Sequence, residues 1–218
     1  MLLGVRICNY DVFDDNKCGL VLEDFLDLNE NKELTSRPLT NLAAFIGKNS
    51  TGKSSFIDDL SFIKKSVTAD VAVASTLNNR PGFSNLVIDK SKPSRFYMYF
   101  CLKPNIDSKK CYVEYDLEIN TNNHGSPYVE SERITLCSKN SDVYETTSVM
   151  DFHNGKGKIL TSITNGKLNY EENEICDEHS CALKVFGSIK SYKILHALYR
   201  EISRWFFCKF STSSTPTS

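Results

Sequence analysis

The chain has 218 residues, of which 40% are hydrophobic and 24% charged, and its net charge is −1. These values are ordinary for a globular protein that is long enough to bury a substantial core, and they give no general electrostatic case for nucleic acid or membrane binding. No stretch approaches the roughly 18 consecutive apolar residues of a membrane span, and the N-terminus lacks the basic segment and apolar core of a signal peptide. We therefore expect a cytoplasmic protein without membrane contact.

The first predicted elements are two paired strands, at residues 2–10 and 20–22, separated by the turn-rich segment Asp14-Asp15-Asn16. Residues 42–46 are a short continuous apolar run, which is typical of a parallel strand buried on both faces. After residue 55 the apolar residues recur at three- and four-residue spacing, which predicts an amphipathic helix.

The segment between that strand and that helix fits the pattern G-x-x-x-x-G-K-[ST] completely. It consists of Gly47, Lys48, Asn49, Ser50, Thr51, Gly52, Lys53, Ser54 and Ser55. Strand, glycine-containing loop and helix in this order predict a nucleotide-binding site formed by these nine residues. The alternative is a glycine-containing turn in which the lysine and serine occur by chance.

The expected chemistry follows from backbone geometry. Gly47 and Gly52 can adopt conformations that are closed to residues with a Cβ, so successive N–H groups can point at a phosphate near the positive end of the helix dipole. Lys53 would reach the β- and γ-phosphates as the catalytic cation, and the Ser54 hydroxyl would ligate Mg²⁺. The pattern thus predicts ATP and Mg²⁺ as ligands.

Beyond residue 93 the apolar period changes from helical to two. Alternation at residues 96–102 and 113–119, further candidates at 128–137 and 143–152, and the hairpin signal Asn165-Gly166 together predict an antiparallel sheet. Helical spacing returns at residues 189–206, where His196 is expected to be a packed side chain rather than a ligand.

We divide the chain into a nucleotide-binding core at residues 1–92, a β-rich subdomain at 93–182, a C-terminal helix at 183–210 and a polar, disordered tail at 211–218. The eight cysteines are scattered, and we expect them to be free thiols. The one tight group, Cys176, His179 and Cys181, lacks a fourth ligand nearby, so a zinc site is not expected.

Taken together, these features resemble the N-terminal lobe of AAA-type ATPases of the ABC class, the relatives of the RecF, SMC and OLD-nuclease ATPases. The residues that carry the resemblance are Gly47-x-Asn49-x-x-Gly52-Lys53-Ser54-Ser55, Arg80-x-Gly82-Phe83, Tyr112-x-x-Tyr115-x-Leu117-x-Ile119, the acidic Glu130 to Glu132, and the run from Ile202 to Phe207. The resemblance implies an α/β, P-loop NTPase-like fold with an antiparallel β-sheet insertion and a C-terminal helix. It departs from the family at Ser50, where glycine is usual.

Hydrolysis in that family also needs a glutamine, a Ser-Gly-Gly signature and an apolar strand that ends in Asp-Glu. The chain contains no glutamine and no Ser-Gly-Gly, and its nearest acidic strand end is Asp89, which is followed by Lys90. Asp89 is either a Mg²⁺ partner or, as we favour, a loop aspartate. The resemblance therefore implies the front half of an ATPase, with a partner or dimer supplying the missing motifs and nucleic acid involved by family analogy alone.

Three functions remain open at this point. The leading hypothesis is ATP binding without efficient hydrolysis. A small GTPase or nucleotide kinase is disfavoured, because no Asn-Lys-x-Asp guanine motif follows the loop. A non-catalytic interaction module or remnant, with a degenerate nucleotide site and the alternating acidic strand at residues 113–119 as a docking surface, is the third.

Overall fold

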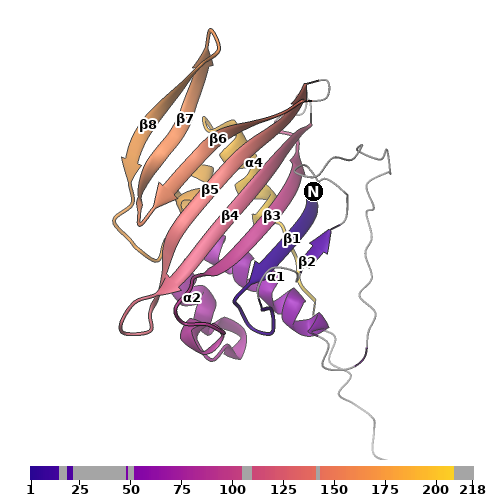
Figure 1. Ribbon diagram of the computed structural model, residues 1–218, viewed down its shortest axis with the longest axis vertical. Helices are drawn as coiled ribbons and strands as arrows, with labels where there is room; N and C mark the ends of the chain where they lie inside the picture. Colours follow the sequence, from indigo (N-terminus) through magenta and orange to yellow (C-terminus); the bar gives the residue numbers. More distant parts are fainter. Residues whose placement is uncertain (15–18, 22–47, 49–51, 105–109, 141–142, 209–218) are drawn as a thin grey trace, which may run out of the picture.

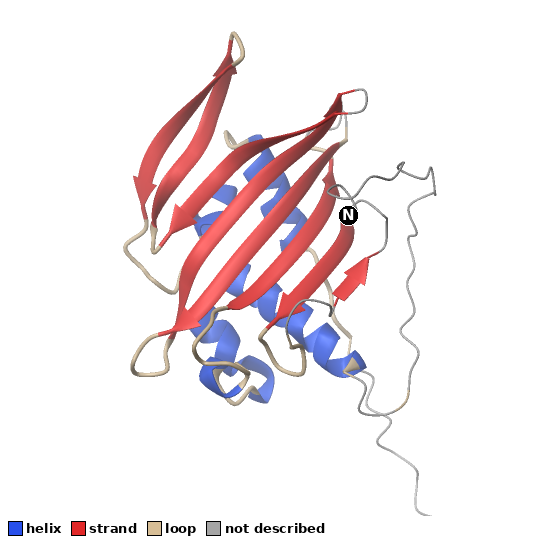
Figure 2. Ribbon diagram, viewed as in Figure 1, coloured by secondary structure: helices blue, strands red, loops and turns tan. Residues whose placement is uncertain are grey.

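The computed structural model describes residues 1–14, 19–21, 48, 52–104, 110–140 and 143–208 of the chain. Eight strands form one sheet in the order β2-β1-β3-β4-β5-β6-β7-β8, and the helices lie behind it on one face (Figures 1 and 2). The strands are β1 Leu2–Cys8, β2 Gly19–Val21, β3 Ser94–Leu102, β4 Cys111–Thr121, β5 Pro127–Asn140, β6 Val143–His153, β7 Lys156–Thr164 and β8 Lys167–Glu174. The helices are α1 Lys53–Thr68, α2 Val71–Thr76, α3 Ala182–Gly187 and α4 Lys193–Ser203, with the 3-10 turns η2 Leu77–Asn79 and η3 Phe83–Asn85.

Alternating side chains divide the sheet into a buried and an outer face. On β4 the four apolar side chains from Val113 to Ile119 are fully buried against the helices, whereas the acidic side chains between them are half-buried on the other face. Strict alternation of this kind is what a strand with one face in the core requires.

The outer face carries rows of charged side chains that cross the sheet. One row runs over seven strands in the order Arg6, Tyr97, Asp116, Arg133, Asp151, Lys158 and Glu172. Opposite charges meet directly across neighbouring strands, as in the Arg133–Asp151 ion pair at 3.3 Å. Such pairs favour one register of neighbouring strands, and a one-residue slip would turn the charged side chains toward the core. The rows therefore help to fix the strand alignment.

Helix α1 is held against the sheet by a buried aromatic cluster. The Tyr10 ring lies 5.0 Å from that of Phe62 on α1 and 5.2 Å from those of Phe83 and Phe96, measured between ring centroids. All four side chains are at most 1% exposed. The cluster therefore joins the turn after β1, helix α1, turn η3 and strand β3 into one core.

A buried acid joins the sheet to α3. Glu132 of β5 is fully buried and accepts hydrogen bonds from the Tyr115 hydroxyl at 2.9 Å, from the Leu183 amide at 3.0 Å and from the Ala182 amide. Burial raises the pKa of its carboxyl to about 7, although the hydrogen bonds act in the opposite direction. Glu132 thus caps the first amides of α3 from within the core.

The predicted α/β, P-loop NTPase-like fold is wrong. Every strand pairing in the described residues is antiparallel, whereas that fold is built on a parallel sheet. Two-residue turns at Asn154-Gly155 and Asn165-Gly166 join β6, β7 and β8, and so short a turn can join only antiparallel neighbours. Residues 42–46, where the sequence predicts a buried parallel strand, lie outside the described residues.

Several local predictions are confirmed. The two N-terminal strands pair, a helix follows the glycine motif, the predicted strands beyond residue 93 are present, and Asn165-Gly166 forms a hairpin turn. The Asn154-Gly155 turn carries the same signal, and the sequence analysis missed it.

The single C-terminal helix is also wrong, because two helices, α3 and α4, occupy that region and Trp205 and Phe206 lie beyond the second. Gly187 is the last residue of α3, and a Cβ there would lie 2.6 Å from the Tyr199 Cβ, so glycine lets the two helices approach closely. Residues 211–218 lie outside the described part.

No helix in the described part combines the length and apolar character needed to cross a bilayer.

Candidate functional site

The structure describes the second half of the glycine motif and one residue of the first. Gly52, Lys53, Ser54, Ser55 and Lys48 are described, whereas Gly47, Asn49, Ser50 and Thr51 are not. Gly52 precedes the first turn of α1 with φ 81° and ψ 6°, in the left-handed region. A Cβ at this position would also lie 3.1 Å from Cγ2 of Val12, so both backbone conformation and space favour glycine here.

Lys53 turns back toward the start of the motif. Its Nζ donates a hydrogen bond to the Lys48 carbonyl oxygen at 2.5 Å, which brings the two ends of the loop together through one side chain. The neighbouring Ser54 is exposed on the outer side of the same turn. The lysine and the serine of the motif are therefore both presented at the beginning of α1.

The N-terminus of α1 favours an anion. Among the residues that the structure describes, no side chain caps it, and its first turn contains no acidic residue. The first N–H groups of a helix have no partner within the helix, and they lie at the positive end of its dipole. With the Lys53 ammonium added, this end of α1 has the donors and the charge that bind phosphate groups.

A buried ion pair that the sequence analysis missed fixes the orientation of α1. Arg80 is 8% exposed, and its Nε donates to Asp58 Oδ2 at 2.9 Å while another guanidinium nitrogen donates to the Asp58 carbonyl at 2.7 Å. Arg80 also donates to the Ala74 carbonyl and lies over the Phe62 ring. Asp58 is one and a half helical turns after Lys53, so this contact anchors the helix just beyond the motif.

The turn after β1 lies beside the motif. Tyr10 and Phe13 form an isolated bridge, and the Phe13 ring packs edge-on against Phe56 of α1 at 6.2 Å. Val12, at the tip of this turn, is 57% exposed, and its Cγ2 would lie 3.1 Å from a Cβ at position 52. An apolar surface therefore borders the beginning of α1, and no local pattern of residues predicts it.

Two buried polar atoms lie behind this turn. Within the described residues, the Tyr10 hydroxyl and Asp59 Oδ2 have no hydrogen-bond partner, and Asp59 is only 2% exposed. Burial, helped by the nearby charges of Asp11 and Asp58 and opposed by Arg80, raises the pKa of the Asp59 carboxyl to about 8. Asp59 therefore holds its proton at neutral pH.

The other residues singled out in the sequence do not form a site with Lys53. Asp89 lies in a loop, where its carboxylate accepts hydrogen bonds from the Ser91 amide and hydroxyl, and these lower its pKa. His179 contacts the Pro127 carbonyl through Nδ1, and His196 contacts that of Gly187. No group of three or more metal-ligating residues occurs in the part of the chain that the structure describes.

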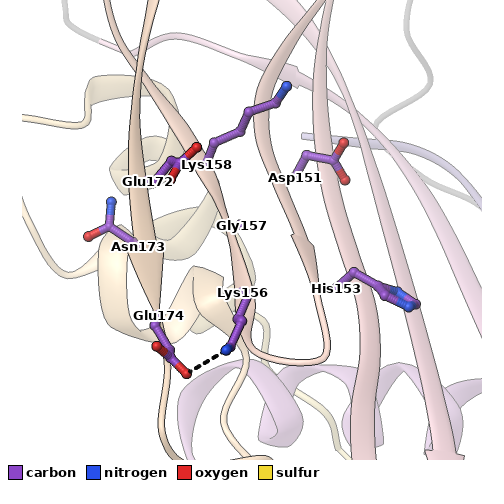
Figure 3. Close-up of a pocket in the computed structure, with 8 residues that line it drawn as sticks. All are labelled: Asp151, His153, Lys156, Gly157, Lys158, Glu172, Asn173 and Glu174. Atoms are coloured by element: carbon purple, nitrogen blue, oxygen red, sulfur yellow. Dashed lines mark ion pairs between the residues drawn. The ribbon is translucent and has the colours of Figure 1, made fainter.

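A separate hollow of about 630 Å³ lies over β6, β7 and β8 on the outer face (Figure 3). It is lined by Asp151, His153, Lys156, Gly157, Lys158, Glu172, Asn173 and Glu174. Figure 3 shows Lys156 directed at Glu174, with which it forms an ion pair at 3.4 Å. Because acids and bases here alternate and offset one another, the hollow offers less net charge to a phosphate than the start of α1 does.

Comparison of the chain with protein-family models, with curated proteins and with solved structures finds no match. The candidate site at Gly52–Ser55 therefore depends on its own residues and geometry.

Proposed function

We propose that the chain binds ATP through residues 47–55, with Lys53 contacting the β- and γ-phosphates. The observation that carries the proposal is the uncapped N-terminus of α1, preceded by the left-handed Gly52 and bordered by the Lys53 ammonium. Oriented amides and a fixed cation at one helix end are the usual elements of a triphosphate site. Gly47, Lys48, Asn49, Ser50 and Thr51 would complete the loop around the phosphates.

The donor set also fits Mg²⁺. The exposed Ser54 hydroxyl is adjacent to the Lys53 contact, so it can serve as a ligand to a cation bridged by phosphate oxygens. Bound Mg²⁺ would neutralise phosphate charge, while Ser54 orients the ion and Lys53 supplies a second positive charge. The proposal extends to binding only, because Asp58 is engaged by Arg80 and Asp59 is buried, so neither acid of α1 reaches the phosphates as a base.

The exposed Val12 gives the base a place to lie. A purine ring held against its apolar side chain would remain close to the triphosphate at Gly52, since a Cβ at Gly52 would lie only 3.1 Å from Val12 Cγ2. We place this activity in the cytoplasm. The cysteines that the structure describes are free thiols, which are the usual form in that reducing compartment.

Equilibrium binding of a fluorescent ATP analogue tests the proposal. Lys53→Ala removes a charged hydrogen-bond donor and should weaken binding roughly ten- to hundredfold. Lys65→Ala is the matched control, because Lys65 lies on the same helix, is exposed and is remote from the motif. Equal affinity of the wild type and Lys53→Ala would end the proposal, and competition with GTP would show whether the base is selected.

The second candidate function is a non-catalytic interaction module. It is favoured by the outer sheet face, which the described helices leave open and on which Arg95 lies 3.9 Å above the Tyr97 ring. Such a module would need a protein partner or a dimer, as the sequence analysis also anticipated. A melting temperature unchanged by ATP and Mg²⁺ would favour it, because a ligand bound only by the folded state must raise that temperature.

A further inference from the structure

Strands β6 and β7 separate partway along their length, at the opposite side of the sheet from β1. Their pairing covers only four residue pairs, from His153–Lys156 to Met150–Ile159. Beyond that point the β7–β8 hairpin swings away from β6 (Figure 1). Within the described residues, the β6 segment at 146–149 and the β7 segment at 160–164 therefore do not pair with each other.

Backbone groups of β6 are directed into this separation. The Ser148 carbonyl accepts a hydrogen bond from the Tyr170 hydroxyl of β8 at 2.9 Å, so it points toward the β7–β8 side. Residues two apart on a strand direct their N–H and C=O groups to the same side, and Thr146 therefore faces the separation too. The Ser148 hydroxyl is buried without a hydrogen-bond partner in the described part of the chain.

A cavity of about 290 Å³ opens between Val149 of β6, strand β7 and the start of α4. Apolar side chains from three elements line it: Val149 of β6, Leu160 and Ile163 of β7, and Ile194 and Leu195 of α4. Ile163 is 58% exposed, as expected for the wall of an open apolar site. Lys193, at the start of α4, adds one positive charge to the lining.

We propose that this separation is a binding site for an extended peptide segment of a partner protein. The segment adds as a strand along β6, places an apolar side chain in the cavity and pairs an acidic residue with Lys193. In the described residues the backbone of β6 from Thr146 to Ser148 has no strand neighbour on this side, and only the Ser148 carbonyl there is held, by Tyr170. An added strand would supply that neighbour, and the lining offers apolar and charge complementarity for its side chains. This site is independent of the proposed nucleotide site.

The test uses a fluorescein-labelled peptide of alternating threonine and valine, about six residues long, with one terminal glutamate. It should bind the wild-type chain, and Ile163→Asp should weaken binding at least about tenfold. Leu168→Asp is the control, because Leu168 lies directly opposite Ile163 on β8 but does not line the cavity. The same peptide with alternate backbone nitrogens methylated should not bind, since it cannot complete a strand ladder.

The proposed contact between Lys193 and the acidic residue of the peptide is tested by two charge-reversing substitutions. Lys193→Glu should weaken binding of the glutamate peptide and improve binding of a lysine-ended peptide, whereas Lys190→Glu, at an exposed position outside the cavity, should change neither.

Amide hydrogen exchange of the free chain gives a readout that needs no peptide. The Thr146 and Ser148 amides should exchange much faster than that of Thr147, which faces β5.

Three results would overturn the proposal. These are slow exchange at Thr146 and Ser148 in the free chain, absence of peptide binding up to about 1 mM, and equal binding of the methylated peptide. A dimer that Ile163→Asp dissociates would show that a second copy of the chain, and not a partner peptide, occupies the site.

Discussion

At the scale of single residues, Asp59 has the largest consequence for stability. Its folded pKa of about 8 lies above its ordinary value of 3.8, so between those pH values the folded protein holds a proton that the unfolded chain has released. The stability that this proton confers is fully present below about pH 4 and is lost as pH rises toward 8. Glu132, with a pKa raised to about 7, acts in the same direction.

Asp59→Asn should therefore raise the melting temperature, and the gain should be larger at pH 8 than at pH 5. The neutral amide of asparagine keeps the shape of the side chain. It also removes the free energy that the wild-type carboxyl costs above its ordinary pKa, where it must either stay protonated or become charged in the core. Thermal unfolding across this pH range measures the effect, with the exposed Glu172→Gln as a control of unchanged pH profile. A gain that is the same at both pH values would refute the buried, protonated state of Asp59.

At this scale, the sequence predicted those features that depend only on residues close together in the chain. The motif predicted a glycine in a special conformation at Gly52 and a lysine and serine at the start of a helix, and both are present. It could not predict the Asp58–Arg80 ion pair, because the two residues are 22 apart and meet only through the path of α2 and η2. Nor could it predict the burial of Asp59, which depends on how the turn at Tyr10 packs on α1.

At the scale of elements, the two Asn-Gly hairpins allow a direct comparison. Gly155 and Gly166 both have positive φ, 76° and 74°, but a Cβ at Gly155 would lie 2.6 Å from the Ile175 carbonyl oxygen, whereas nothing lies within 4 Å of one at Gly166. Gly166→Ala should cost about 1 kcal/mol for the left-handed conformation alone. Gly155→Ala should cost clearly more, because the backbone must also move.

Urea unfolding of the two variants measures this difference in the free energy of unfolding. Gly166→Ala serves as the control for conformational strain, so the excess loss in Gly155→Ala reports the contact with Ile175. Equal losses in both variants would contradict the close approach of the chain segments at the β6–β7 turn.

Strands were predictable because alternation and turn signals act over a few residues. The alternating β4 sequence and the Asn165-Gly166 turn specify a half-buried strand and an antiparallel hairpin without reference to the rest of the chain. The C-terminal region was mispredicted as one helix, because the helical spacing at residues 189–206 showed neither the separate helix α3, which ends at Gly187, nor the end of α4 at Ser203. Helix periodicity does not show where tertiary contacts interrupt a helix.

At the scale of the whole molecule, the fold class was wrong because one motif outweighed the larger pattern. A glycine loop specifies its own backbone and the helix after it, but it says nothing about which strands pair. The strands of the described sheet, joined by short turns and matched by rows of opposite charges, determine the antiparallel architecture. The sheet leaves the start of α1 accessible at one side and the β6–β7 separation at the other.

The most direct test of triphosphate binding at the start of α1 is to follow backbone amide shifts by NMR while inorganic triphosphate, ATP or adenosine is added with Mg²⁺. The account predicts that triphosphate and ATP shift the amides of Gly52, Lys53, Ser54 and Ser55 most strongly and that adenosine alone barely affects them. Unchanged amides at these four residues, with shifts instead in the hollow over β6 to β8, would contradict it.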